Sequence, residues 1–414
     1  MKVTGTWTLD QRLDQWARVM VHLPSTGSES QQARYDINLG DGSTRHRVIN
    51  QKSTKNEWFP LGTYRFVDGG LPLSISLSNA TGDGTADADV AWDAVAFVPL
   101  AAKPKDMVVA MGDSFSSGEG AGKFGPETDR DYGKPTWNAC HRSANAWSRK
   151  AVLPGRTATV GQLADSNDPT MDYQFVACSG AYTDNLLGKG SSTYRDNETA
   201  PWGWGLDGEF KEIPQLGSGV LSKDTTLVTL SVGGNDARFA GLADACSRTD
   251  CSDSGYTYAN DPKPVAVHEP ELIATTIKPK ITQILAEIRD QAPDAKIVLM
   301  GYPRLFSPTA CIVEYNDREV ALFNSWADVL NDRMRDAAAA TGDANTVFTS
   351  PRDKFIGHAV CDGPHFMNPI SFTRNGPGDF TEVYMPSRGS LHPNELGTTA
   401  YAEVLQEALN GTLH

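Results

Sequence analysis

The chain has 414 residues, of which 39% are hydrophobic and 21% charged, and its formal net charge at neutral pH is −14. This length and composition are typical of a protein with two globular domains. The negative charge would repel nucleic acid and anionic membranes, and no apolar run is long enough to span a bilayer. We therefore expect no nucleic acid as a partner and no transmembrane segment.

Short β-rich segments separated by turn signals occupy the first hundred residues. Gly and Asp cluster between these segments, at positions 40–42, 68–70 and 82–84. Short strands spaced regularly by such turns are typical of antiparallel sandwiches. We therefore expect a small antiparallel β-sandwich domain over residues 1–100, with strands at 18–23, 33–39, 62–66, 73–77 and 90–98.

Three phrases of this segment resemble the golvesin C-terminal-like domain, a β-sandwich attached to secreted bacterial enzymes. They are YDI at 35–37, WFPLGTY at 58–64 and AWDAV at 91–95. The tryptophans of the segment could form a platform for a sugar, but rings of this size in a small sandwich are more often buried. We expect a core position for all four of them, Trp7, Trp16, Trp58 and Trp92.

The pattern changes after a short linker at 100–105. Apolar runs suited to buried parallel strands lie at 107–111, 173–177, 226–232 and 296–301, and amphipathic helical stretches lie at 273–291, 317–341 and 394–409. Alternation of this kind predicts an α/β domain over residues 106–414, a flavodoxin-like doubly wound parallel sheet. Sites in such folds lie beyond the carboxyl ends of the strands.

The first strand of this domain ends in GDSFSSGEG at 112–120, which places Ser114 at a strand end. Glycines around a serine permit a sharp exit from the strand and a close approach of substrate to the backbone. A serine hydroxyl requires a neighbouring base to act as a nucleophile at neutral pH, and histidine is suited to that role. Ser114 is therefore a candidate nucleophile.

Four blocks in chain order resemble the SGNH (GDSL) hydrolase family, in its secreted actinobacterial lipase and esterase branch. They are GDS at 112–114, CSGA at 178–181, GGND at 233–236 and LHPN at 391–394. Each block alone has a structural explanation as a strand end or a helix cap. Their common order, each at a predicted strand end or helix start, favours the catalytic interpretation.

The resemblance implies the role of each residue. Ser114 would be the nucleophile and His392 its base, and the reaction would need no metal and no cofactor. The tetrahedral oxyanion would be stabilised by fixed hydrogen-bond donors. By resemblance, these donors are the main-chain N–H groups of Ser114 and Gly180 and the side-chain amide of Asn235.

One position departs from the family pattern. Many members carry an acid three residues before the histidine, where this chain has Gly389. A backbone carbonyl could orient the imidazole instead, and we favour this possibility. A distant acid could also do so, or the enzyme could be slow; the candidate acids are Asp362, Asp379 and Glu382. His365 is a competing base, but its flanking residues do not match the motif, so we expect a surface or substrate-lining role for it.

Six cysteines, an even number, allow complete pairing by any of 15 connectivities. Pairing of neighbours is our preference, because each pair would close a separate local loop: Cys140 with Cys178, Cys246 with Cys251, and Cys311 with Cys361. A zinc site formed by Cys246, Cys251 and a histidine is the weaker alternative, since neither a CxxC nor an HxxxH spacing is present. Disulfides indicate export, so we expect a secreted protein. The first seven residues lack the apolar stretch of a signal peptide, as a mature chain or a fragment would.

The expected activity is hydrolysis of carboxylic esters through an acyl-serine intermediate. Phospholipids and acetylated polysaccharides are alternative substrates of the same mechanism, since these motifs do not encode acyl-chain length. Long stretches at 191–212, 246–267 and 365–388 are expected to border the mouth of the site. The alternative from another class is a polysaccharide-binding or cell-wall-binding protein with a degraded hydrolase domain, and the sandwich could make such a contact in either case.

Overall fold

The computed structural model describes residues 2–52, 56–82, 89–134, 136–188, 210, 212–308, 315–381 and 385–411. Among these residues, no helix combines the length and the apolar character that crossing a membrane requires.

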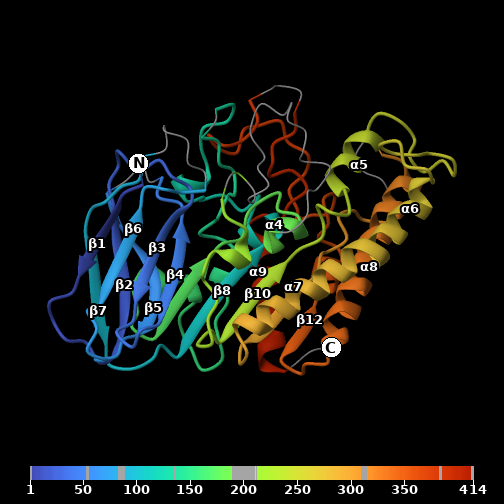
Figure 1. Ribbon diagram of the computed structural model, residues 1–414. Helices are drawn as coiled ribbons and strands as arrows, with labels where there is room; N and C mark the ends of the chain where they lie inside the picture. The colour runs from blue at the N-terminus through green and yellow to red at the C-terminus, as the bar shows by residue number, and fades with distance from the viewer. Residues whose placement is uncertain are drawn as a thin grey trace.

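The first hundred residues form two antiparallel sheets, blue in Figure 1, which we call the N-terminal sandwich. One sheet has the strand order β1-β6-β3-β4 and the other the order β5-β2-β7. The strands are β1 (Thr4–Thr8), β2 (Trp16–Leu23), β3 (Ala33–Asn38), β4 (Thr44–Ile49), β5 (Glu57–Arg65), β6 (Ser74–Ser78) and β7 (Val95–Leu100). The expected sandwich is thus confirmed, although the sequence patterns did not reveal β1 and β4.

The core of the N-terminal sandwich follows from alternation along the strands. In β3, Tyr35 and Ile37 are buried while Arg34 between the buried positions is exposed. These side chains pack with Val19 of the other sheet. The expectation that all tryptophans lie in this core is wrong for Trp58, which is 48% exposed. A second tryptophan outside the core, Trp92, lies instead against Gly5 of β1.

The rest of the chain forms a five-stranded parallel sheet with helices on both faces, which we call the α/β part. The strand order is β12-β11-β10-β8-β9, so the direction of winding reverses between β8 and β10. The strands are β8 (Asp106–Gly112), β9 (Met171–Phe175), β10 (Leu227–Ser231), β11 (Lys296–Met300) and β12 (Thr346–Thr349). The predicted flavodoxin-like sheet is confirmed, with β12 as an additional edge strand.

Two apolar layers hold the sheet between its helices. Val109 of β8 points to the layer that contains Ile284 of α7, and Val108 points to the opposite layer, which contains Tyr401 of α9. The helices are α1 (Ser114–Ser117), α2 (Trp147–Lys150), α3 (Val160–Asp165), α4 (Thr183–Leu187), α5 (Phe239–Cys246), α6 (Val265–Leu272), α7 (Lys278–Gln291), α8 (Asp317–Ala340) and α9 (Glu395–Asn410). Short 3₁₀ turns lie at Pro126–Thr128, Gln215–Gly217 and Arg352–Phe355.

The helix expected at 273–291 begins earlier and is interrupted. α6 leads into a π-helical turn, Ile273–Ile277, before α7 starts. Pro279 has no N–H to donate, and the N–H of Lys278 bonds to the carbonyl of Ile273, five residues back. The apolar period of α7 itself was recognised correctly, because Ile281, Ile284 and Ile288 face the sheet.

Buried arginines join the N-terminal sandwich to the α/β part. Arg18 of β2 donates to the carbonyl oxygens of Asn167, Asp168 and Met171 at 2.6–2.8 Å. The main-chain N–H of Thr63 in β5 donates to Asp172 of the edge strand β9 at 2.7 Å. The two parts therefore meet along an edge of each of their sheets.

Candidate active site

Ser114 stands at the exit of β8, the first strand of the parallel sheet. Gly112 before it has a φ of 114°, and a Cβ there would lie 2.2 Å from the carbonyl oxygen of Ser231 in β10, so only glycine fits. Asp113 caps α1, its carboxylate accepting from the N–H of Phe115 at 3.0 Å. The chain therefore turns sharply and makes Ser114 the first residue of α1, 5% exposed.

His392 lies just ahead of α9, the last helix of the chain. Its Nε2 is 2.8 Å from the Oγ of Ser114, and its Nδ1 is 2.9 Å from the carbonyl oxygen of Ser390. A carbonyl can only accept, so Nδ1 carries the proton and Nε2 accepts from the hydroxyl of Ser114. The cap of α9, Asn394, accepts from two main-chain N–H groups and fixes the start of that helix.

The charge state of His392 follows from its surroundings. Burial lowers its pKa from the ordinary value of 6.5, because a charged imidazolium is poorly solvated there. The charge of Glu119 and the carbonyl of Ser390 oppose this shift, whereas the charge of Arg388 adds to it. The imidazole is thus neutral at neutral pH, the form that can accept a proton.

The loops after β9 and β10 are tied together. Asn235, after β10, donates from its side-chain amide to the carbonyl of Ala181 at 2.9 Å, one residue beyond Gly180. The carboxylate of Asp236 accepts from the N–H and hydroxyl of Thr183 at 2.9 and 2.5 Å. Gly180, with a φ of 87°, and Asn235 are thus held in adjoining loops at the carboxyl ends of β9 and β10, the two strands that flank β8.

A residue that the sequence patterns did not reveal, Tyr302, links the blocks at 112–114 and 233–236. Its hydroxyl donates to the buried carboxylate of Asp113 at 2.5 Å and accepts from the N–H of Gly234 at 3.1 Å. Burial raises the pKa of Asp113 to about 7, against the effect of this hydrogen bond. Its place just beyond the end of β11 was the available signal, because polar residues at strand ends face this edge of the sheet.

Family models match nearly the whole chain. The model of the GDSL-like lipase/acylhydrolase family matches residues 110–400, and that of the golvesin C-terminal domain matches residues 2–99. The chain belongs to the GDSL-like lipase/acylhydrolase family. The resemblance identified from the four sequence blocks is thereby confirmed, and the chain is an ester hydrolase of this family.

Relatives of this hydrolase come from Streptomyces. Lipase 1 of Streptomyces coelicolor is 27% identical over 311 residues, which are 73% of this chain and 87% of that protein. A lipase of Streptomyces rimosus is 28% identical over 306 residues, which are 72% of this chain and 85% of that protein.

Two solved structures have the same fold as the hydrolase. The phospholipase A1 of Streptomyces albidoflavus matches 74% of this chain and 98% of its own, with 25% identity and a TM-score of 0.50. The extracellular lipase of Streptomyces rimosus matches 73% of this chain and 99% of its own, with 25% identity and a TM-score of 0.51.

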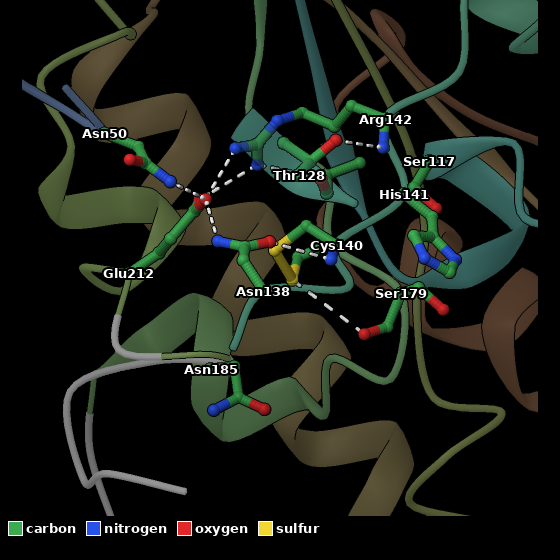
Figure 2. Close-up of a disulfide and its surroundings, with 12 residues drawn as sticks. Asn50, Ser117, Thr128, Asn138, Cys140, His141, Arg142, Ser179, Asn185 and Glu212 are labelled. Carbon is green, nitrogen blue, oxygen red and sulfur yellow. Dashed lines mark hydrogen bonds and ion pairs between the residues drawn. A yellow bond between two sulfur atoms is a disulfide. The ribbon is translucent and has the colours of Figure 1, made fainter. Parts of the chain in front are cut away.

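Disulfides brace the hydrolase near the loop after β9. Cys140 is bonded to Cys178, two residues before Gly180 (Figure 2). The N–H of Ser179 donates to the carbonyl of Cys140 at 2.9 Å. A second disulfide joins Cys246 to Cys251, so these two sulfurs are not free thiolates for a metal. Of the third expected pair, Cys361 is disulfide-bonded and Cys311 lies outside the described residues.

The acids considered above as partners of His392 form hydrogen bonds elsewhere, where the structure describes them. Asp379 is fully buried and accepts from the hydroxyl of Ser387 and from main-chain N–H groups of its own loop. Asp362 accepts from Ser307 and Ala359. Glu382 lies outside the described residues, as does most of the expected loop at 191–212 with Trp202 and Trp204. His365 is exposed, and the imidazole bonded to Ser114 is that of His392.

One cluster of possible metal ligands in the described part of the hydrolase is already satisfied by an arginine. Ligand atoms of Asp261, His268 and Glu269 lie within 4.8 Å of one another. The guanidinium of Arg238 donates to Asp261 at 2.7 Å and lies 2.9 Å from Nδ1 of His268. A fixed cation at this place competes with a metal ion for the same oxygens.

A cavity of about 630 Å³ lies between the N-terminal sandwich and the α/β part of the hydrolase. Trp58 and Phe59 line it from the sandwich, and Phe124 and Tyr173 line it from the α/β part. Neither Ser114 nor His392 belongs to its walls. This cavity is therefore separate from the candidate active site.

Proposed function

We propose that the chain hydrolyses carboxylic esters through an acyl-serine intermediate. Ser114 Oγ attacks the ester carbonyl while Nε2 of His392 takes the hydroxyl proton, and that proton then passes to the departing alcohol. Water, deprotonated by the same imidazole, attacks the acyl-serine and releases the acid and the free serine. The observation that carries this proposal is the 2.8 Å contact between Ser114 and a correctly oriented His392.

In the same proposal, the oxyanion accepts hydrogen bonds from the N–H of Ser114, the N–H of Gly180 and the side-chain amide of Asn235. The N–H of Ser114 belongs to the first residue of α1 and has no acceptor within that helix. The amide of Asn235 has two hydrogens, and the bond to Ala181 uses one of them. Donors fixed before the reaction starts stabilise the transition state most effectively.

The deciding experiment is hydrolysis of p-nitrophenyl butyrate by the wild type and by Ser114→Ala. We expect a loss in kcat of at least about a thousandfold, because removal of a serine nucleophile leaves only the oxyanion donors and binding. Ser166→Ala, a change of an exposed serine at the end of α3, serves as the control and should retain the wild-type rate. Equal inertness of wild type and Ser114→Ala would favour the binding-protein alternative.

The substrate class that we propose is an acyl lipid, since the relatives are named lipases and a phospholipase A1. A series of p-nitrophenyl esters of increasing acyl length measures this, because pocket shape decides chain-length preference. We expect kcat/KM to hold or rise beyond about four carbons. A sharp fall there would point to a short-chain esterase or a polysaccharide acetylesterase.

We also propose that the protein is secreted and that the N-terminal sandwich contacts polysaccharide. Disulfides and an extracellular relative support the first point, and immunoblotting of the culture medium tests it. The half-exposed ring of Trp58 at the wall of the cavity supports the second. Co-sedimentation with insoluble polysaccharide, compared between wild type and Trp58→Ala, measures that contact.

A further inference from the structure

Glu119 is a buried carboxylate to which neither the sequence patterns nor the proposed reaction gives a role. Its side chain is fully buried, and one oxygen lies 2.6 Å from Nδ1 of His141, whose other nitrogen faces Asp129 at 3.3 Å. Asn375 donates to the second oxygen at 3.4 Å, and Arg388 lies 4.0 Å away. A buried charge is tolerated only when it is paired and hydrogen-bonded, as this one is.

The pairing keeps Glu119 ionised. Burial would raise the pKa of its carboxyl, but the charge and hydrogen bond of His141 outweigh burial and lower that pKa to about 2. Burial would in turn lower the pKa of His141, and the charge of Glu119 outweighs it and raises that pKa to about 9. Glu119 therefore carries a fixed negative charge throughout the pH range in which a histidine base works.

Glu119 directly precedes a residue that packs against His392. Gly120, the next residue, has a φ of 86°, and a Cβ there would lie 2.9 Å from the Cβ of His392. The side-chain amide of Asn368 donates to the carbonyls of both Gly120 and Gly389, at 2.9 and 3.1 Å. The Glu119 segment and the histidine loop are thus held in fixed register.

Many family members carry an acid at position 389. In this chain, the residues that surround Gly389 also contact Glu119 or adjoin it in sequence. A Cβ on Gly389 would lie 2.9 Å from the side-chain nitrogen of Asn375 and 3.4 Å from the Cα of Gly120. Asn375 is the residue that donates to Glu119. The room for a side chain at 389 is therefore filled by groups that belong to the surroundings of the buried carboxylate.

We propose that Glu119 stabilises the imidazolium that His392 becomes when it takes the proton of Ser114, supplying from the first block the charge that an acid at position 389 would supply. It acts through space as a positioning and electrostatic residue, because Nδ1–H of His392 is already bonded to the carbonyl of Ser390. A carbonyl orients the ring but brings no net charge. The inference rests on the proposed function of Ser114 and His392.

The titratable and charged groups around His392 have to be considered together. The carboxylate of Glu119 favours the protonated imidazole, and the guanidinium of Arg388 disfavours it. Asp113, which directly precedes Ser114, accepts a hydrogen bond from Tyr302. Three further charged or titratable groups contact these residues: His141 contacts Glu119, Asp129 contacts His141, and Asp379 accepts from the main-chain N–H of Arg388.

Replacement of Glu119 by glutamine tests the inference through the pH dependence of kcat/KM for p-nitrophenyl butyrate, from about pH 4 to about pH 9. The change also removes the charge that keeps buried His141 protonated, so His141 becomes neutral with it. Glu119, and not His141, is among the charges that shift the pKa of His392, so we expect the acidic limb to move down by up to about one pH unit and the plateau to fall by up to about tenfold. This pair of changes, wider tolerance of acid with slower turnover, would not result from loosened packing alone. Titration with an organophosphonate counts the folded active sites.

Two further variants make the test decisive. Glu212→Gln removes another carboxylate, one that is partly buried and paired with the cation of Arg142, and should leave the acidic limb where it is (Figure 2). Arg388→Gln removes the charge that opposes Glu119, so the limb should move to higher pH. The two charges act on His392 in opposite directions, so the shift in this variant should have the opposite sign to that of Glu119→Gln.

Opposite shifts in the two charge variants would support the inference. Limbs that coincide with the wild type, or that move in the same direction in both variants, would overturn it while leaving the esterase mechanism intact. A wild type without Ser114-dependent hydrolysis would instead overturn the proposed function, and the inference with it.

Discussion

The carbonyl of Ser390 occupies the place that a carboxylate has in a serine triad, and the difference is one of charge. An acceptor without charge fixes the tautomer and the orientation of His392. Its hydrogen bond raises the pKa of His392, but burial outweighs this effect and lowers that pKa below its ordinary value. The residue-scale consequence is a base that stays neutral in mildly acidic solution.

We therefore predict an acidic limb of kcat/KM that lies below the ordinary histidine pKa of 6.5. The neutral ring accepts the proton of Ser114, so the rate is fully present above the pKa of His392 and is lost as the pH falls through it. A pH–rate profile of the free enzyme with p-nitrophenyl butyrate measures this value. A limb centred above 6.5 would contradict the assignment of burial as the dominant influence.

At the scale of elements, long and strongly patterned segments were predictable, and short ones were not. The helix expected at 317–341 is α8, Asp317–Ala340, whose Asn316 and Glu319 form a reciprocal cap. β12 has only four residues, and β4 is mostly polar, so neither carries a clear period. Such elements form because neighbouring strands already present their hydrogen-bonding groups, which the local sequence does not record.

The two described disulfides close loops of very different length, which leads to a prediction about stability. Cys140 and Cys178 are 38 residues apart, and Cys246 and Cys251 are 5 apart. The chain-entropy model gives about 4 kcal/mol for the longer loop and about 2 kcal/mol for the shorter one. We expect Cys140→Ala/Cys178→Ala to lower the free energy of unfolding in urea more than Cys246→Ala/Cys251→Ala does.

The same pair of variants separates stability from activity. The Cys140–Cys178 bond adjoins Ser179 and Gly180, so its loss should also lower kcat, whereas the Cys246–Cys251 variant should keep kcat at about the wild-type value when assayed well below its melting temperature. Equal kcat values for the two variants would argue against Gly180 as an oxyanion donor.

At the scale of the whole molecule, the N-terminal sandwich and the α/β part are joined by polar rather than apolar contacts. Arg18 is 5% exposed and donates to three carbonyl groups, two in the turn before β9 and one at the first residue of β9. Arg47 is 3% exposed and reaches Ser218 and Gln174. These hydrogen bonds of two buried guanidinium groups should hold the two parts in one relative orientation. The division into domains at residues 1–100 and 106–414 stays a prediction.

Arg18→Met tests the strength of this junction. The substitution keeps the apolar stem and removes the arginine donor from three carbonyls, of which that of Met171 is buried, so we expect a loss of about 2–3 kcal/mol in the free energy of unfolding. Calorimetry should show a lower melting temperature, or a separate early transition of one part. Arg12→Met, at an exposed residue paired with Asp68 inside the sandwich, is the control and should change the melting temperature little. Equal melting temperatures for the two variants would mean that the junction contributes nothing to stability.

The sequence by itself determined the order of the two parts and the parallel sheet, because apolar periods are local properties of the chain. The blocks around Ser114, Gly180, Asn235 and His392 were recognised by their resemblance to the family, and the roles of these residues stay predictions. Only the tertiary structure brought the hydroxyl of Ser114 and the imidazole of His392 to 2.8 Å. It also placed the carbonyl of Ser390 at 2.9 Å from Nδ1 of His392 and buried Glu119 against His141. Contacts between residues 278 positions apart depend on how the sheet and its last helix pack, which no local pattern contains.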